Sequence, residues 1–155
     1  MNASTTAALS VSTPSNFDEA ADYIWNNSFD KPTLVVSRAR VGEQYDALNA
    51  GLGNANIHYA VKANPAPEII RLLVERGSGF DAASRQEIEL CLSQGADPAK
   101  ISFGNTIKRG VDIAFAHSIG VTLFAADCEA ELDKIAAHAP GARVYIRLIV
   151  ENSLA

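Results

Sequence analysis

Short apolar runs alternate with longer amphipathic segments along most of the chain. Six runs have the length and composition of strands: 33–36, 57–61, 79–82, 101–104, 121–125 and 143–150. The segments between them carry apolar residues three and four positions apart, as Ile69, Leu72 and Leu73 do, which is the period of a helix packed on one side. Strands that alternate with helices in this way predict an α/β fold with a parallel sheet.

Glycines and one capping motif mark the ends of the predicted helices. Glycines 51, 77, 95, 120 and 141 each follow a helical segment, at intervals of about 18–26 residues. A glycine there can adopt the left-handed conformation that ends a helix. Ser84-Arg85-Gln86-Glu87 matches a capping box, in which the Ser84 side chain takes the Glu87 N–H and Glu87 returns to the Ser84 N–H.

A repeating βα pattern leads to either a doubly wound sheet or a (β/α)8 TIM barrel. No glycine-rich dinucleotide loop follows the first predicted strand, which disfavours the doubly wound sheet. A complete barrel takes about 250 residues, so we expect these 155 residues to form the N-terminal portion of a truncated barrel.

The predicted domain organisation has two parts. Residues 1–30 are expected to be a tail and a short helix, because the first thirteen are uncharged and rich in Ala, Ser and Thr. In that helix, Tyr23, Ile24 and Trp25 would form the apolar face. Residues 31–155 are expected to be the incomplete barrel.

Composition excludes several classes of protein. The chain is 48% hydrophobic and 20% charged, with a net charge of −5 and no cluster of Lys or Arg, which argues against nucleic acid or an anionic membrane as a partner. No apolar run approaches the length of a bilayer span, and the first basic residue is Lys31, so no charged leader is expected. A cytoplasmic protein is the default expectation.

The two cysteines do not suggest disulfides or a metal. Cys91 and Cys128 are too few for a disulfide framework, and neither belongs to a zinc or haem spacing, so we expect no metal site. Cys91 lies among apolar residues and is expected in the core.

Lys62 stands out by its position. It follows the strand-like run 57–61, and Pro65 and Pro67 end any strand soon afterwards. This places an ammonium group at the carboxyl end of a strand, where parallel α/β proteins collect binding and catalytic groups. The alternative is a lysine that lays its stem along the strand end and keeps its head in water.

The stretch Tyr59-Ala60-Val61-Lys62-Ala63-Asn64-Pro65 resembles the lysine motif of the pyridoxal-phosphate (PLP) decarboxylases with an alanine racemase-like, fold-type III barrel. These are the ornithine, lysine, diaminopimelate and arginine decarboxylases. The resemblance continues through 77–84, 87–90 and 101–105 and ends with the strand that carries Arg147. Blocks 80–84 and 102–105 are most similar to the ornithine/lysine branch.

The resemblance implies a set of site residues. Lys62 is expected to hold pyridoxal 5'-phosphate as a Schiff base, and Asp81 and Arg147 match residues that line the cofactor site. Ala60 shares a strand face with Lys62 and would leave room for the cofactor. A charge within an apolar run must be paired, so we expect an ion pair between Asp81 and Arg147 near the cofactor or the substrate, with a purely structural pair as the alternative.

The resemblance also implies a function and partners. The expected reaction is decarboxylation of a basic amino acid, ornithine to putrescine in polyamine biosynthesis first and lysine next. Alternatives are a diaminopimelate decarboxylase or racemase on the same barrel, a non-catalytic regulatory relative, or an inactive truncated product.

Family members are homodimers. Their phosphate loop and C-terminal β domain would lie beyond Ala155, so we expect this chain alone to be inactive.

Overall fold

The computed structural model describes residues 18–53 and 55–150. Its contacts divide the chain into two compact units, 1–37 and 38–155, which we describe separately. In the first unit, α1 (Asp18–Trp25) confirms the predicted short helix, and the rings of Tyr23 and Phe29 lie 6.2 Å apart. The tail expected before α1 lies outside the described residues.

The strand predicted at 33–36 is wrong. These residues have no regular secondary structure, and Leu34 is 84% exposed. An apolar run becomes a strand only where a neighbouring strand takes up its backbone hydrogen bonds. Among the described residues, this run has no such partner. The sheet therefore has five of the six predicted strands.

The second unit contains a five-stranded parallel sheet with the order β1-β2-β3-β4-β5. The strands are β1 (His58–Ala60), β2 (Gly79–Ala82), β3 (Ile101–Phe103), β4 (Leu123–Ala126) and β5 (Arg143–Ile146). The connections contain α3 (Pro67–Glu75), α4 (Arg85–Ser93), α5 (Gly110–Ser118) and α6 (Glu129–His138), with short 3-10 helices at Val61–Ala63 and Pro98–Lys100. This confirms the predicted α/β fold.

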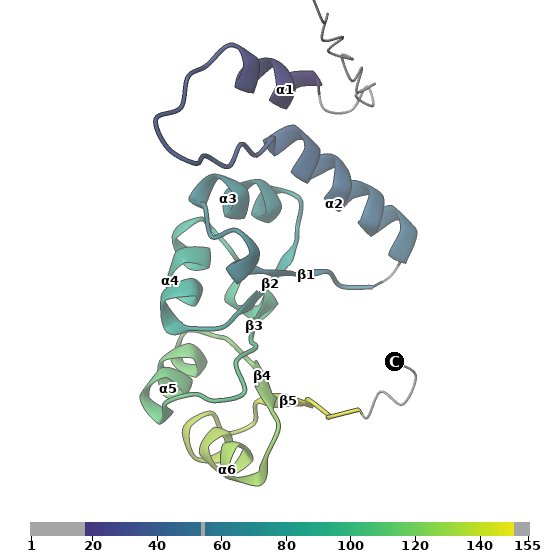
Figure 1. The fold of residues 1–155 in the computed structure, drawn as a ribbon. Helices are drawn as coiled ribbons and strands as arrows, with labels where there is room; N and C mark the ends of the chain where they lie inside the picture. Colours follow the sequence, from purple (N-terminus) through teal and green to yellow (C-terminus); the bar gives the residue numbers. More distant parts are fainter. Residues whose placement is uncertain (1–17, 54, 151–155) are drawn as a thin grey trace, which may run out of the picture. The chain divides into compact units, whose positions relative to one another are not determined.

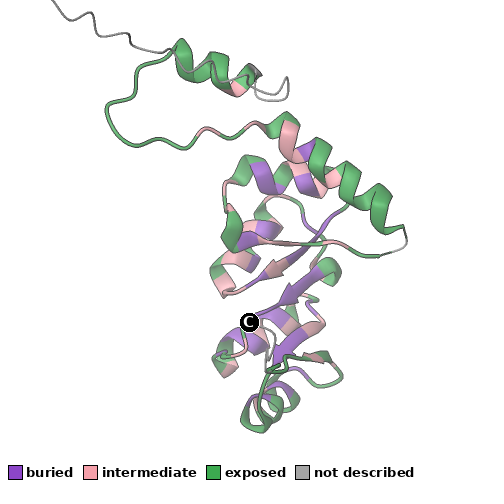
Figure 2. Ribbon diagram, turned by 45° about the vertical axis from the view of Figure 1, so that its right-hand side comes forward, coloured by how far each residue is buried: buried purple, intermediate pink, exposed green. Residues whose placement is uncertain are grey.

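Helices α3 to α6 stand in a row along one face of the sheet (Figure 1). A parallel strand pair cannot be closed by a tight turn, so each connection crosses over through a helix. Strand residues at alternate positions pack against this helical layer: Phe80, Ala82, Ile101, Phe103 and Phe124 are all at most 2% exposed. Buried residues lie on the strands and on the inward helix surfaces (Figure 2).

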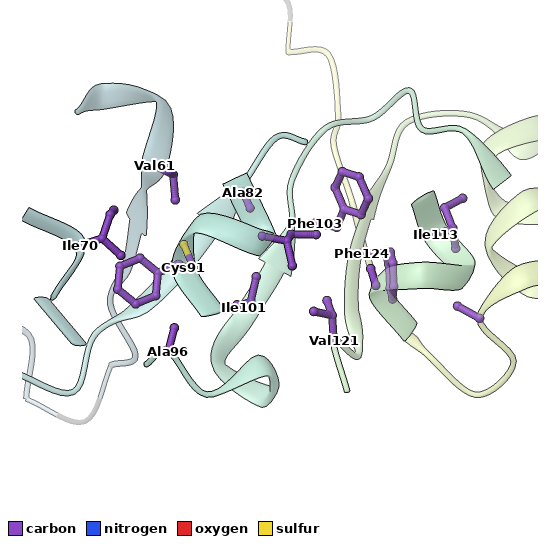
Figure 3. Packing of buried hydrophobic residues seen from close by; sticks show 14 of the residues in the cluster. Val61, Ile70, Ala82, Cys91, Ala96, Ile101, Phe103, Ile113, Val121 and Phe124 are labelled. Atoms are coloured by element: carbon purple, nitrogen blue, oxygen red, sulfur yellow. The ribbon is translucent and has the colours of Figure 1, made fainter. Parts of the chain in front are cut away.

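The core between the sheet and the helices is made almost entirely of apolar side chains (Figure 3). Ile70 of α3, Cys91 of α4 and Ile113 of α5 are each fully buried in it. The prediction for Cys91 is confirmed, and burial, assisted by the nearby Glu87 charge, raises the pKa of its thiol to about 12. Cys128 is exposed.

Helix α2 (Arg38–Leu52) is the longest, with 15 residues, and packs against α3. The Arg76 guanidinium lies against Gly42, in space that a Cβ there would occupy. Val41 and Tyr45 pack against the core, while Leu48 is 50% exposed. Over the described residues, no helix has the length and apolar character needed to cross a membrane.

The predicted helix ends are confirmed at four of five glycines. Glycines 77, 95, 120 and 141 have positive φ, but α2 runs past Gly51 and ends before Gly53, which takes the left-handed conformation instead. At α4, the Glu87 N–H donates to Ser84 Oγ at 3.2 Å, as the capping box predicts. The Glu87 carboxylate accepts from the Ala83 N–H at 2.6 Å, one residue earlier than expected.

Phe80 should be among the residues that stabilise the unit most. Phe80→Ala removes a fully buried ring from the middle of the sheet and leaves a cavity, so we expect the free energy of unfolding to fall by about 3–5 kcal/mol. The matched control is Ile107→Ala at a 77% exposed side chain, which should change it by less than about 0.5 kcal/mol. Urea denaturation of both variants measures the difference, and equal effects would contradict the described core.

Candidate active site

Lys62 lies directly after β1, in the 3-10 helix that ends the strand. Val61 is fully buried and anchors this turn in the core, while Lys62 is exposed. Asn64 stabilises the segment that follows, because its side-chain oxygen accepts from the Ala66 N–H at 3.1 Å. The Lys62 ammonium makes no hydrogen bond or ion pair with any described residue. Its amine is therefore at the carboxyl end of the strand, as predicted, and available for a ligand.

Ala60, Asp81 and Ser102 form one row across three adjacent strands. The register pairs Ala60 with Asp81 and Asp81 with Ser102. Paired residues of a parallel sheet share a face, and this row lies opposite Phe80 and Ile101, which face the helices. A carboxylate is thus flanked by two small side chains on the face away from the helical layer.

The Asp81 carboxylate is held through one of its two oxygens. Ser102 Oγ lies 2.8 Å from Oδ1 and donates to it, and the Tyr145 hydroxyl donates to the same oxygen at 3.4 Å. Gly104, just beyond β3, lies against this carboxylate, and a Cβ at that position would overlap it. Oδ2 has no hydrogen-bond partner among the described residues.

The predicted ion pair between Asp81 and Arg147 is wrong. No such pair occurs among the ion pairs of residues 18–53 and 55–150. Arg147 lies one residue beyond the end of β5 and is exposed, and its guanidinium donates to the Gly104 carbonyl at 3.2 Å. Asp81 instead accepts hydrogen bonds from two hydroxyl groups. Gly104 lies between the two charges: it touches the Asp81 carboxylate, and its carbonyl accepts from Arg147.

Tyr145 is suited to be a hydrogen-bond donor. Burial and the negative charge of Asp81 raise the pKa of its phenol above the usual value, and Arg147 and Ser102 only partly oppose this. The hydroxyl therefore keeps its proton throughout the neutral and mildly alkaline range.

Sequence reasoning missed Ser102, Gly104 and Tyr145. The two-residue period of a strand could have indicated them, because residues two apart share a face of the sheet. Ser102 and Gly104 are two apart in the block 101–105, and Tyr145 precedes Arg147 by two residues. Tyr59 packs on the core, whereas His58 is exposed on the opposite face of β1, with its Nδ1 3.4 Å from the Phe80 carbonyl.

A second cluster of charges, also unpredicted, is buried between the β3–α5 loop and α6. Glu131 is 2% exposed and pairs with two ammonium groups, Lys108 Nζ at 2.8 Å and Lys134 Nζ at 2.5 Å. Lys108 Nζ also donates to the carbonyls of Asn105 and Ala125, at 2.9 and 2.6 Å. The cluster fixes the loop that begins with Gly104. It also leaves Lys108 with no free capacity for a ligand.

The charge balance of this cluster decides the ionisation of Glu131. Burial alone would raise its pKa, but the hydrogen bonds and charges of Lys108 and Lys134 outweigh that effect and lower it. A carboxyl group whose pKa is lowered by folding contributes stability above its unfolded pKa and loses that contribution as the pH falls through its folded pKa.

Comparison with known proteins identifies the family. Residues 38–155 match the family model described as pyridoxal-dependent decarboxylase, pyridoxal binding domain. The chain belongs to the pyridoxal-dependent decarboxylase family. The fold-type III resemblance inferred from the Lys62 motif is thereby confirmed, and so is PLP as the cofactor of the family.

Relatives of this decarboxylase-family chain include both enzymes and a protein named as an inhibitor. It is 39% identical over 124 residues to a lysine/ornithine decarboxylase of Selenomonas ruminantium, an alignment covering 80% of this chain and 32% of that protein. It is 38% identical over 95 residues to antizyme inhibitor 2 of Xenopus laevis, covering 61% of this chain and 21% of that protein. The chain thus spans about a third of its relative's length or less.

A solved structure shares the fold. The crystal structure of a protein named SrLDC, in complex with PLP and cadaverine, superposes on this chain with a TM-score of 0.76 at 35% identity. The superposition covers 89% of this chain and 36% of that one. The sheet and its helices are therefore the N-terminal part of a PLP-decarboxylase barrel.

The described residues fit a pyridoxal group. Lys62 supplies an amine without a protein partner, Ala60 and Ser102 are small, and Asp81 presents a fixed carboxylate with one oxygen unused. The missing Cβ of Gly104 leaves room for that carboxylate.

Gly104→Ala should disturb the carboxylate. The added methyl group would overlap Asp81 and displace it from Ser102, so we expect the free energy of unfolding to fall by about 1–3 kcal/mol. Gly51→Ala is the matched control: nothing lies within 4 Å of that Cβ, inside α2, and the same substitution should stabilise the helix by about 0.5–1 kcal/mol. Urea denaturation of both variants measures whether the free energy of unfolding falls or rises. A stabilising Gly104→Ala would contradict the described contact.

Glu131→Gln should destabilise the protein in a pH-dependent way. Near pH 7 it leaves a buried lysine without its counter-charge, so we expect a loss of about 3–5 kcal/mol. The difference from wild type should shrink as the pH falls through the lowered folded pKa of Glu131, because the wild-type carboxylate then becomes protonated as well. Urea titrations across this range measure it, with Glu129→Gln, exposed on the same helix, as the control. A deficit that did not change with pH would contradict the ionic origin.

Proposed function

We propose that the complete protein is a PLP-dependent decarboxylase of a basic amino acid, with Lys62 as the residue that binds the cofactor covalently. Ornithine is the first choice of substrate and lysine the second. The observation that carries the proposal is the amine of Lys62, which has no described partner and follows β1 directly, two residues after Ala60, the register partner of Asp81. The family match at residues 38–155 supports it independently.

The chemistry needs an amine that can give up its proton and reach the cofactor aldehyde. The Lys62 ammonium has no ion-pair partner among the described residues, and its exposure gives a ligand access. When bound, PLP supplies an electron sink for the charge left on the α-carbon as carbon dioxide departs. The residues of this chain bind and orient the reacting groups.

Three further residues are proposed to hold the cofactor. Ala60 leaves space beside Lys62 on the same strand end. Asp81 offers an unpaired carboxylate oxygen to a hydrogen-bond donor, and Arg147 offers an exposed guanidinium at the same end of the sheet. A fixed anion and a fixed cation orient a polar ligand more strongly than either alone.

A basic amino acid fits both the acidic net charge of −5 and the names of the relatives. SrLDC was solved with cadaverine, which is a diamine, and this supports a diamino acid as the substrate class here. Conversion of ornithine would give putrescine and place the protein in polyamine biosynthesis. We also propose a homodimer, as the family resemblance implies, a cytoplasmic location as the default, and no activity for this 155-residue chain alone.

A second candidate function is that of a non-catalytic regulator. The relative named antizyme inhibitor 2 favours it. The retention of Lys62, Asp81 and Arg147 together argues for the enzyme. The two candidates differ in covalent cofactor binding and in release of carbon dioxide from ornithine or lysine.

Lys62 should be the single site of PLP attachment. The experiment uses protein expressed from the entire reading frame, incubated with PLP, reduced with borohydride and mapped by peptide mass spectrometry, which should find the pyridoxyl group on Lys62. Lys62→Ala should lose this group and lower decarboxylation by at least about a thousandfold, the scale of losing a covalent catalytic group. Lys62→Arg should fail too, because guanidinium stays protonated.

Lys100→Ala is the control. Lys100 lies before β3, at the opposite end of the strands, and its ammonium donates to the Gly77 carbonyl. This variant should keep both the pyridoxyl group and the activity. A pyridoxyl group on another lysine would refute the assignment of Lys62, and absence of any PLP binding by wild type would favour the regulator.

A further inference from the structure

The Asp81 carboxylate receives both of its hydrogen bonds on the same oxygen, from two different strands. Ser102 comes from the neighbouring strand β3, and Tyr145 comes from β5. A serine hydroxyl has one proton to donate. The 2.8 Å contact with Oδ1 is much shorter than the 3.4 Å contact of the same hydroxyl with the Phe80 carbonyl, so the proton goes to Asp81.

The bond from Tyr145 crosses the inside of the curved sheet. β2 and β5 are three positions apart in the strand order, which in a flat sheet is about 14 Å. Side chains that stand upright on a flat sheet would not meet over that distance. The hydroxyl of Tyr145 nevertheless lies 3.4 Å from Asp81. The sheet therefore curves toward this face, and the hydrogen bond spans its concave side.

The result is a one-sided arrangement of the carboxylate. Oδ1 is occupied by hydroxyl donors that are partly or fully buried, while Oδ2 has no partner in the described part of the chain. Gly104 lies against the group, and its lack of a Cβ leaves the space that the carboxylate occupies. A carboxylate fixed in this way can accept a hydrogen bond from a ligand without first giving up a bond to the protein.

We propose that Ser102 and Tyr145 are positioning residues that act through Asp81, orienting its free oxygen toward the bound cofactor–substrate pair. This inference rests on the proposed function. It adds two residues from separate strands whose effect on the ligand depends entirely on the carboxylate they hold.

The test measures the affinity of the apoprotein for PLP, by absorbance titration of full-length variants. Ser102→Ala and Tyr145→Phe each remove one donor from a charged acceptor, and each should weaken PLP binding roughly tenfold. Ser102→Thr keeps the hydroxyl and should restore most of the affinity. The controls Ser118→Ala and Tyr45→Phe remove the same groups from α5 and α2 and should leave it unchanged.

A double-mutant cycle separates positioning from a general structural effect. In an Asp81→Ala background there is no carboxylate to orient, so Ser102→Ala and Tyr145→Phe should each change PLP affinity by less than about twofold. Urea denaturation of every variant confirms that the protein is folded before it is titrated.

Each outcome has one meaning. If wild type and Lys62→Ala behave as proposed but the two hydroxyl variants bind PLP like wild type, the positioning role is refuted and the proposed function stands. Equal losses with and without Asp81 also refute it. If wild type itself forms no adduct on Lys62, the proposed function fails first. Loss of affinity that disappears in the Asp81→Ala background supports the inference.

Discussion

Parallel pairing of consecutive strands is the constraint on which this structure depends. Because two parallel strands need a crossover connection, every strand from β1 to β4 is followed by a helix, and α3 to α6 lie together on one face. The carboxyl ends of all five strands then meet at one edge. Lys62, Asp81 and Arg147 are 85 residues apart from first to last in the sequence, and this pairing brings them to a common edge.

The two faces of the sheet serve different purposes. One face supplies the apolar core, with residues such as Phe80 and Phe124 fully buried against the helices. The other carries the carboxylate of Asp81 and the hydroxyl groups that hold it. Since strand residues alternate between the faces, the same short segment Gly79–Ala82 contributes both to stability and to the site.

Sequence patterns predicted the elements well and the side-chain partners poorly. The run 79–82 was predicted with its observed bounds, because an apolar strand and a glycine-capped helix leave strong local signals. The run 33–36 is more apolar than 79–82 but forms no strand, since pairing depends on neighbours distant in the chain. A charge in a strand signals that some partner is needed, but not which one. The strand register and the curvature of the sheet make Ser102 and Tyr145, and not Arg147, the partners of Asp81. Neither the register nor the curvature can be obtained from local sequence.

The contrast between the two cysteines gives the protein a built-in reporter. Thiolate is the reactive form of cysteine, and Cys91 is fully enclosed with a pKa of about 12, whereas Cys128 is exposed at the start of α6. A thiol reagent added to the folded protein therefore meets one of them immediately. Cys91 becomes accessible only when α4 separates from the sheet. The rate of the slow phase of labelling therefore reports how often the helical layer opens.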